Sequence, residues 1–365
     1  MAGDCFYSKV LNRRDFLKTS GLVTAALTLE PLLGCAPTLK ELRTDVAKIN
    51  WDCNPTLPIP AEGCYIGGYR SGRFGFDNKV NYESYGKAAG KMPAFWDISI
   101  QKFGAVNDNF PTDKCNEMIR MGVIPGFKYG MEPLQAMKEI ADGKKDGLIE
   151  KFAEKALIYG EPYLFNPFKE MNLQSKSYWN HGGEPPKLFI KAWRHMDDIL
   201  KAVGANHNTI RAIHFFNAGG TLNAKMLPAE YYYPGDDVVD IISFTVCNRV
   251  GVGEPYADFK QLIEYDYNWA RDKHPRKPLA ILEMEHSNAP SQPRWISKTY
   301  KDIKNEFPAI KIVQWWESLR MPGYSWSDDQ SFSNNPKSVE AMQEALSDPY
   351  FIGGPLPFLE KYRKT

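Results

Sequence analysis

The sequence of 365 residues has almost no excess charge, and its six cysteines form no metal-binding pattern. Its 45 Lys and Arg residues balance 44 Asp and Glu residues, which gives a formal net charge of +1. Nucleic-acid-binding proteins need a basic surplus to neutralise phosphates, so this balance argues against a nucleic-acid partner. The sequence contains no CxxC motif and no His/Cys cluster, so a structural zinc site is not expected either.

Several sequence signatures of common enzyme classes are also missing. No Gly-rich dinucleotide fingerprint follows an early apolar run, which argues against an open nucleotide-binding sheet. The chain has no G-x-S-x-G turn and no Ser-His-Asp ordering, which argues against an esterase. Internal repeats and low-complexity tracts are absent from the sequence, and this favours one domain of catalytic size.

Aromatic side chains are abundant, with 9 Trp, 19 Tyr and 20 Phe. Such rings fill a large core and, where they are exposed, stack on the apolar faces of ligands. Composition alone favours core filling, so the positions of the rings along the chain must decide which of them bind a ligand.

A twin-arginine export signal with a lipoprotein cleavage site is expected over residues 1–34. Arg13 and Arg14 precede an apolar stretch that is too short to span a membrane. This stretch ends in the tetrapeptide LLGC, which looks like a bacterial lipobox and predicts lipidation of Cys35. A buried N-terminal helix is the alternative. We therefore expect twin-arginine export and a lipid anchor in the bacterial envelope, either periplasmic or at the cell surface.

A Pro-containing, irregular linker is expected over residues 35–62. Four cysteines remain beyond the lipidation site, and an oxidising compartment permits disulfides between them. Cys53 and Cys64 flank a Pro-rich stretch and form the best pair, with Cys115 and Cys247 left over.

The folded domain is expected over residues 63–365, where short apolar runs alternate with amphipathic segments. Near-continuous apolar runs of this length are typical of strands buried on both faces. Eight strands that alternate with helices predict a (β/α)8 TIM barrel, and an open doubly wound sheet is the alternative. Strands are expected at Tyr65–Tyr69, Pro93–Ser99, Val123–Tyr129, Pro162–Glu170, Ile210–Asn217, Val239–Val246, Pro278–Glu285 and Ile310–Glu317. Helices are expected at Asp113–Arg120, Leu134–Asp142, Gly147–Ile158, Lys187–Val203, Tyr256–Lys273, Ser291–Phe307 and Ser338–Ser347.

Carboxylates stand at the ends of two of these predicted strands. Glu170 ends the fourth strand, and Glu283 and Glu285 lie near the end of the seventh. In a TIM barrel the active site lies at the C-terminal ends of the strands, and a carboxylate there is costly to bury unless it faces a polar cleft. A separation of about 5 Å suits a nucleophile with an acid/base, whereas about 6.5–9.5 Å leaves room for an attacking water. Salt-bridged rim residues are the alternative.

Taken together, these segments resemble glycoside hydrolase family 26, the β-mannanase-type enzymes, over nearly the whole chain after the signal. The order and spacing of six stretches carry the resemblance: VIPGFKYG, IADGKKDGLIEKFAEKA, YLFNPFKEMN, YYYPGDDVVDIISFTV, KPLAILEMEHS and FPAIKIVQWWES. The resemblance implies a retaining glycoside hydrolase that needs no cofactor or metal, with Glu170 as acid/base and Glu283 as nucleophile. It implies a β-linked polysaccharide substrate, such as mannan, mixed-linkage glucan, β-1,3-xylan or an exopolysaccharide.

The resemblance also implies residues that contact the sugar. Polar groups beside the acid/base and rings at the catalytic face are expected to bind the substrate. These residues are Lys169, Asn172, Trp179, Trp315, Trp316, Tyr324 and Trp326. Which of the two adjacent tryptophans faces inward depends on the strand register.

The sequence departs from the family pattern at four positions. Asn166 and Lys169 stand where the family usually has Arg and His. Leu173 replaces a common Gly, and Cys247 replaces a common aromatic residue. A Lys169 side chain that points into the cleft would stabilise ionised Glu170 and weaken it as an acid. These departures keep open an alternative function, a catalytically weak carbohydrate-binding envelope lipoprotein on the same barrel. A monomer is expected in either case.

Overall fold

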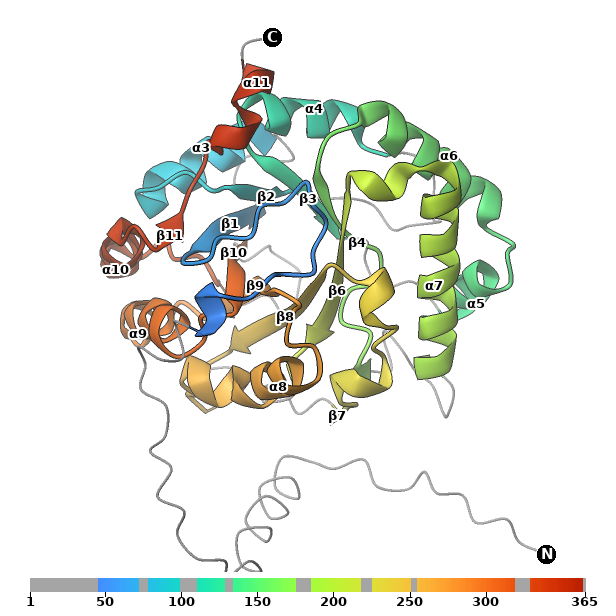
Figure 1. Ribbon diagram of the computed structural model, residues 1–365. Coiled ribbons are helices and arrows are strands. Elements are labelled where there is room, and N and C mark those ends of the chain that lie inside the picture. Colours follow the sequence, from blue (N-terminus) through green and yellow to red (C-terminus); the bar gives the residue numbers. More distant parts are fainter. Residues whose placement is uncertain are drawn as a thin grey trace, which may run out of the picture.

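Parallel strands close into a barrel in the computed structural model (Figure 1). The structure describes residues 45–71, 78–98, 110–128, 134–174, 185–217, 225–250, 255–318 and 329–363. Neighbouring strands pair in parallel, and the last pairs with the first, so the ring is complete. The predicted (β/α)8 fold is confirmed. The barrel strands are β1 (Cys64–Ser71), β2 (Phe95–Asp97), β3 (Ile124–Lys128), β4 (Tyr163–Asn166), β6 (Thr209–Phe216), β8 (Ile241–Asn248), β9 (Leu279–His286) and β10 (Ile310–Ser318).

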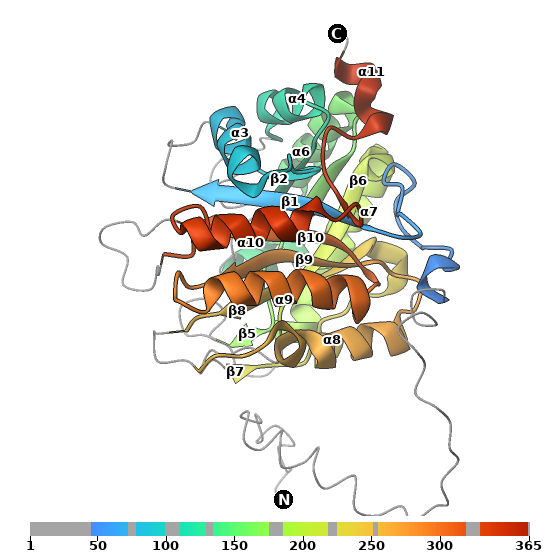
Figure 2. The ribbon, with the colours of Figure 1, turned by 90° about the vertical axis from the view of Figure 1, so that its left-hand side faces the viewer.

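Helices lie between the strands and cover the outside of the barrel (Figure 2). All the predicted helices are present near their expected places. Among the described residues, no helix is long and apolar enough to cross a membrane. The helices are α3 (Asn78–Ala89), α4 (Thr112–Arg120), α5 (Leu134–Ala141), α6 (Asp146–Tyr159), α7 (Pro185–Val203), α8 (Phe259–Lys273), α9 (Gln292–Asn305), α10 (Pro336–Ser347) and the short α11 (Glu360–Arg363).

A few elements of the structure were not expected from the sequence. Helix α3 buries Asn81, Tyr82 and Tyr85, so its inner face lacks the aliphatic periodicity that announces a helix. Its helical state depends on packing against the barrel. Three two-residue strands also appear, with β5 and β7 paired antiparallel and β11 added beside β1. They are β5 (Leu173–Gln174), β7 (Lys225–Met226) and β11 (Phe351–Ile352).

The hydrophobic core has two parts because side chains along each strand alternate between the barrel interior and the helix layer. In β1 and β2, Tyr65 and Phe95 belong to the smaller cluster inside the barrel. Their neighbours Ile66 and Trp96 belong to the larger cluster between the sheet and the helices. This alternation decides which side chains near the strand ends can reach the barrel mouth.

The segment before β1 packs across the end of the barrel from which the strands start (Figure 2). Asn54 donates hydrogen bonds of 3.0 and 2.9 Å to the carbonyl oxygens of Asn206 and Thr209. The Lys277 ammonium, just before β9, lies 2.7 Å from Asp52 Oδ2. Residues 45–62 of the expected linker are therefore held against the barrel.

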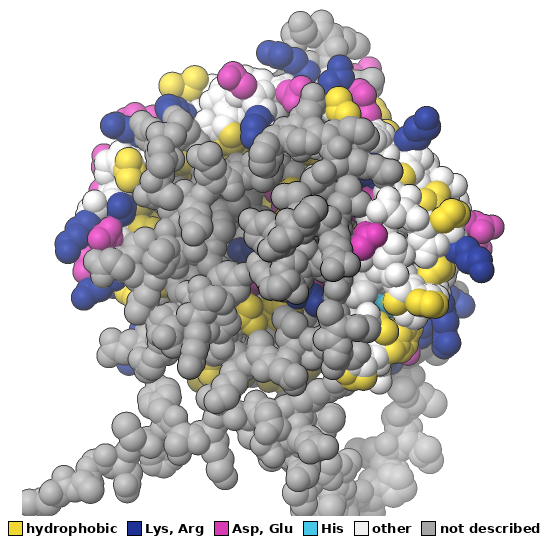
Figure 3. Space-filling view, turned by 180° about the vertical axis from the view of Figure 1, so that it is seen from behind, with side chains coloured by type: hydrophobic (Ala, Val, Ile, Leu, Met, Phe, Trp, Pro, Cys, Tyr) yellow, Lys and Arg dark blue, Asp and Glu magenta, His cyan; other side chains and the backbone are white. Residues whose placement is uncertain are grey.

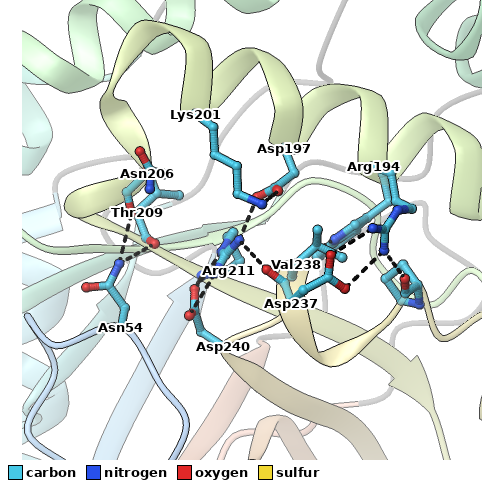
Figure 4. Close-up of polar contacts among 12 residues, drawn as sticks. Asn54, Arg194, Asp197, Lys201, Asn206, Thr209, Arg211, Asp237, Val238 and Asp240 are labelled. Atoms are coloured by element: carbon cyan, nitrogen blue, oxygen red, sulfur yellow. Dashed lines mark hydrogen bonds and ion pairs between the residues drawn. The ribbon is translucent and has the colours of Figure 1, made fainter.

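A charged network ties helix α7 to the same end of the barrel (Figure 4). The Arg211 guanidinium in β6 lies 2.7 Å from Asp197 in α7 and 2.8 Å from Asp240 at the start of β8. Lys201 pairs with the same Asp197 at 2.6 Å. The two cations and the two carboxylates of this network balance in charge. In a TIM barrel the end where the strands begin serves stability rather than catalysis, so we interpret the network as structural.

The predicted disulfide between Cys53 and Cys64 is wrong, because the four cysteines of the described residues are free thiols. Cys64 belongs to the hydrophobic cluster between the sheet and the helices. Cys53 packs against the other cluster, inside the barrel. The buried Cys64 and the half-buried Cys53 therefore pack against different parts of the core, and closeness in sequence does not bring them together.

Candidate active site

The carboxylates predicted at the strand ends meet at the C-terminal end of the barrel. Glu170 follows β4 and Glu283 lies in β9, and their residues are only 7% and 5% exposed. The Lys169 Nζ lies 2.6 Å from Glu283 Oε2 and 3.9 Å from Glu170 Oε1. These two oxygens are therefore no more than about 6.5 Å apart, the sum of the two distances. Within the described residues, no group of His, Cys, Asp and Glu side chains is suited to hold a metal.

A strained turn brings Glu170 to this position. Strand β4 ends at Asn166, earlier than expected, and Glu170 has a φ of 55°. Such a left-handed conformation is costly for a residue with a side chain, and it persists where the surroundings hold it. The Glu170 N–H donates to the His214 carbonyl oxygen at 2.8 Å. The backbone turn thus directs the carboxyl group toward the barrel strands β6 and β8.

Opposing influences set the protonation of Glu170. Burial raises the pKa of its carboxyl group, the Lys169 ammonium opposes this rise, and the charge of Glu283 adds to it. The Thr245 hydroxyl donates to Glu170 Oε1 at 2.6 Å, which also favours the ionised form. The pKa stays above its ordinary value. A raised pKa is what a carboxylic acid needs in order to donate a proton near neutral pH.

Lys169 points into the cleft. Burial acts to lower the pKa of its ammonium, but the charges of Glu170 and Glu283 outweigh burial, and the pKa lies above the ordinary lysine value. The Nζ also lies over the ring of Trp316, 4.9 Å from its centre. The ring of Tyr69 stacks on Trp316 at 3.7 Å. A charged ammonium thus stands between the two glutamates and over the aromatic floor.

The strand register separates the two adjacent tryptophans of β10. Trp315 is fully buried in the helix-side core, where its ring lies 6.0 Å from those of Trp295 and Phe332. Trp316 is half-buried and faces Lys169. Because neighbouring residues of a strand point to opposite faces, only Trp316 can contact a ligand in the cleft.

The side-chain amide of Asn172 forms hydrogen bonds with backbone groups. Its Nδ2 donates to the carbonyl oxygens of Phe216 and Leu227, and its Oδ1 accepts from the Phe216 N–H at 2.7 Å. Asn172 is 1% exposed, and its hydrogen bonds join the turn after Glu170 to the end of β6. In the structure this side chain therefore binds the backbone of the protein. The other expected substrate-binding residues, Trp179, Tyr324 and Trp326, lie outside the described residues.

Sequence reasoning missed two residues that contact carboxylates in the cleft, Arg249 and Thr245. Arg249, just after β8, donates hydrogen bonds of 3.0 and 2.8 Å to Glu285 Oε1. The charge of Glu285 raises the pKa of Arg249, so this second carboxylate of β9 has a cation of its own. Thr245 was missed as well, since a threonine inside a buried strand gives no sign of its partner. A basic residue directly after a predicted strand was the one available signal for Arg249.

Comparisons with known proteins bear on the export signal and on the fold. Residues 10–29 match the family model for the TAT (twin-arginine translocation) pathway signal sequence, which indicates export across the membrane. Endoglucanase H of Acetivibrio thermocellus is 23% identical over 215 residues. That alignment covers 57% of this chain but only 23% of the relative, so the chain spans less than a quarter of that protein's length.

Several solved structures of similar shape are named as family 26 glycoside hydrolases. The catalytic domain of a GH26 endo-β-1,4-mannanase from Bacillus sp. JAMB-750 superposes with a TM-score of 0.59 and 15% identity, over 80% of this chain and 87% of that one. GH26A from Muricauda sp. MAR_2010_75 gives 0.55 and 16%, over 88% and 97%. The chain shares the fold of family 26 glycoside hydrolases. The resemblance noted in the sequence is thus confirmed for the fold.

Proposed function

We propose that the protein is an exported, retaining glycoside hydrolase that cleaves a β-linked polysaccharide. The observation that carries this proposal is the pair of buried carboxylates, Glu170 and Glu283, that contact one ammonium at the C-terminal end of the barrel. Carboxyl groups about 5–5.5 Å apart suit retention, whereas about 6.5–9.5 Å suits inversion. The upper bound of about 6.5 Å between the two glutamate oxygens favours retention.

In this mechanism Glu283 attacks the anomeric carbon while the bond to the leaving oxygen breaks. Glu170 gives its proton to that oxygen, and a glycosyl-enzyme forms. A water molecule then attacks the anomeric carbon, Glu170 takes the proton of the water, and Glu283 is released. The raised pKa of Glu170 supports its role as the acid, because more of it stays protonated at a given pH.

A neutral β-linked hexose polymer, such as mannan or glucan, fits the cleft best. With Glu170 protonated, as its role as the acid requires, the charges of these cleft residues balance, since Lys169 pairs with Glu283 and Arg249 with Glu285. On the described surface seen in Figure 3, basic and acidic side chains are interspersed. The names of similar proteins, endo-β-1,4-mannanase and endoglucanase, point to the same substrate class. The half-buried Trp316 ring supplies an apolar face for a sugar.

A carbohydrate-binding protein without hydrolytic activity is the second candidate. The 2.6 Å ion pair between Lys169 and Glu283 favours it, because an ammonium at this distance occupies the position from which Glu283 would attack. A pure binder would shift on a glycan gel and release no reducing sugar.

Reducing-sugar release from a panel of β-mannans, β-glucans and β-xylans tests the proposal. We expect release from at least one polymer, with kcat lowered more than about 100-fold by Glu170→Gln or by Glu283→Gln. Thermal unfolding of each variant checks that it is folded. Full activity in either folded variant would contradict the assignment of the two glutamates.

We further propose that Cys35 carries a lipid that anchors the protein in the cell envelope. Support comes from the sequence LLGC at residues 32–35, which closely follows the matched export signal. In a bacterial host, Cys35→Ser is expected to move the protein from the membrane fraction to the soluble fraction. Retention of that variant in the membrane fraction would exclude this anchor.

A further inference from the structure

A chain of three side chains inside the barrel ends on Glu170. Asn166 Nδ2 lies 2.7 Å from His214 Nδ1, and His214 Nε2 lies 2.8 Å from Thr245 Oγ1. Thr245 Oγ1 in turn lies 2.6 Å from Glu170 Oε1. Asn166, His214 and Thr245 come from β4, β6 and β8, and each is at most 1% exposed. The chain therefore runs across adjacent strands and is closed to solvent.

The orientation of the Asn166 amide sets the direction of this chain. Asn166 Nδ2 can only donate, so His214 Nδ1 accepts and His214 Nε2 carries the proton of the neutral ring. His214 then donates to the Thr245 oxygen, which leaves the Thr245 hydroxyl proton for Glu170. Each of the three links then has one donor and one acceptor, and the chain ends on a carboxylate as acceptor, while the buried Asn166 Oδ1 makes no hydrogen bond to the described residues.

His214 also holds the backbone of the strained turn. Its carbonyl oxygen accepts the Glu170 N–H at 2.8 Å, and its backbone forms a parallel bridge with Lys169. The left-handed φ of 55° at Glu170 needs such support, because most side-chain-bearing residues avoid this region. His214 thus acts on Glu170 in two ways: it accepts a hydrogen bond from the Glu170 backbone, and it is linked to the Glu170 carboxyl group through Thr245.

We propose that His214 and Thr245 are positioning residues for Glu170, which hold Oε1 in place and leave Oε2 to exchange the proton with the substrate. The catalytic part of this inference rests on the proposed function, whereas the placement of the carboxyl group does not. Sequence similarity gave no role to either residue. The chain instead assigns them to the orientation of the acid/base.

The expected consequence is a change in the protonation of Glu170 when the hydroxyl is removed. A hydrogen bond to an ionised carboxylate favours that form, so its loss raises the pKa of Glu170 by about one unit. The other titratable groups around the carboxyl group stay in place in such a variant. They are Lys169, His214, Cys247, Arg249, Glu283 and Glu285.

The experiment compares Thr245→Val, which has nearly the same shape and no hydroxyl, with Thr245→Ser, which keeps the hydroxyl. Carboxyl-¹³C glutamate labelling follows the titration, and Glu170→Gln identifies the Glu170 signal by its loss. We expect the Glu170 titration midpoint to rise by about one unit in Thr245→Val and to stay within about 0.3 unit in Thr245→Ser. Thr245→Ala provides a second hydroxyl-free variant if the valine does not fold.

Activity gives the second readout. Glu170 must be protonated for the first step, so activity falls as the pH rises through its pKa, and Thr245→Val should move this alkaline limb upward by the same amount. At the optimum, kcat should fall about tenfold with KM little changed, because orientation is lost and binding is not. Thr245→Ser should restore both.

The outcomes separate the two proposals. Unchanged titration midpoints in both folded hydroxyl-free variants would overturn the positioning role, whatever the activity. An inactive wild type whose Glu170 midpoint still shifts in Thr245→Val would contradict the proposed hydrolase and leave the side-chain chain intact. A tenfold loss of kcat with no movement of the pH profile would mean that Thr245 contributes only packing, and it would overturn the proposal.

Discussion

At the scale of the residue, Lys169 decides how the two glutamates can act. A reacting carbon must approach its nucleophile to about 3–3.5 Å. The Lys169 Nζ lies 2.6 Å from Glu283 Oε2 and over the Trp316 ring, which is where the proposed mechanism places the sugar. Since Tyr69 stacks on Trp316 at 3.7 Å, that ring has little free surface while Lys169 stays in place. In the proposed mechanism, binding of a sugar at the reaction centre therefore requires Lys169 to leave Glu283.

Replacing Lys169 with methionine tests this requirement. The variant keeps a long side chain and removes the charge, so the sugar no longer competes with an ion pair, and KM should fall about three- to tenfold. Loss of a cation that lowers the pKa of Glu170 should also move the alkaline limb of activity to higher pH. Steady-state rates measured across a pH series give both quantities.

The control for this variant is Lys191→Met. Lys191 is an exposed lysine of α7 that pairs with Asp142 and has no contact with the two glutamates among the described interactions. It should change neither KM nor the pH profile. If Lys169→Met instead raises KM about tenfold, Lys169 binds the sugar in the way that the family resemblance implied.

At the scale of the element, the seam between the first and last strands closes the barrel. Arg70 of β1 donates to Glu317 Oε2 of β10 at 2.6 Å and to the Ser84 hydroxyl of α3 at 2.7 Å. The Ser331 hydroxyl donates to the other oxygen of Glu317 at 2.6 Å. Arg70 and Glu317 are 5% and 0% exposed, so the pair is shielded from water and salt.

Arg70→Met is expected to lower the free energy of unfolding by about 3–5 kcal/mol, because it leaves the Glu317 carboxylate buried without its cation. Arg194→Met is the matched control, since Arg194 pairs with Asp237 at 2.7 Å but both side chains are largely exposed. That change should cost less than about 1 kcal/mol. Urea unfolding curves measure both, and equal losses would show that burial does not distinguish the two pairs.

The barrel strands were predictable because their apolar runs are long and buried on both faces. Helix α3 was not, since the tyrosines and the asparagine on its inner face carry no helical pattern of aliphatic residues. The sequence also predicted the wrong end for β4. The run from Pro162 to Glu170 looks continuous, yet the chain leaves the strand at Asn166 and turns, and contacts with β6 hold that turn.

The candidate site was predictable where residue type alone carries the chemistry. Glu170, Glu283 and Glu285 stood out as carboxylates near the ends of apolar runs, and the family resemblance then favoured Glu283 over Glu285. The inward member of the pair Trp315 and Trp316 was not predictable, because one residue of register exchanges the two faces of a strand. The partner of Thr245 could not be found either, since three strands must be placed before its hydroxyl meets a carboxylate.

At the scale of the whole molecule, the two ends of the barrel carry different parts of the chain. The candidate site lies at the end where the strands finish. Residues 45–63 cross the end where the strands begin (Figures 1 and 2). The export signal and Cys35 precede residue 45, so a lipid anchor at Cys35 would join the barrel at the end away from the site.

The segment over residues 45–62 is also expected to be part of the folded domain. A chain that starts at residue 45 should unfold in urea like the mature protein. A chain that starts at residue 63 loses the buried Leu57, the two hydrogen bonds of Asn54 and the partner of the buried Lys277. Together these losses should lower the free energy of unfolding by more than about 5 kcal/mol, much of a domain's stability.

Asp52→Asn in the chain from residue 45 separates charge from packing in this result. It keeps the backbone of the segment and removes the carboxylate that faces the Lys277 ammonium, which is 2% exposed. We expect a loss of about 1–3 kcal/mol, smaller than that of the full deletion, since Leu57 and Asn54 remain. Equal stability of the chains that start at residues 45 and 63 would mean that the segment is only a linker, and the closed end of the barrel would then be formed by the strands alone.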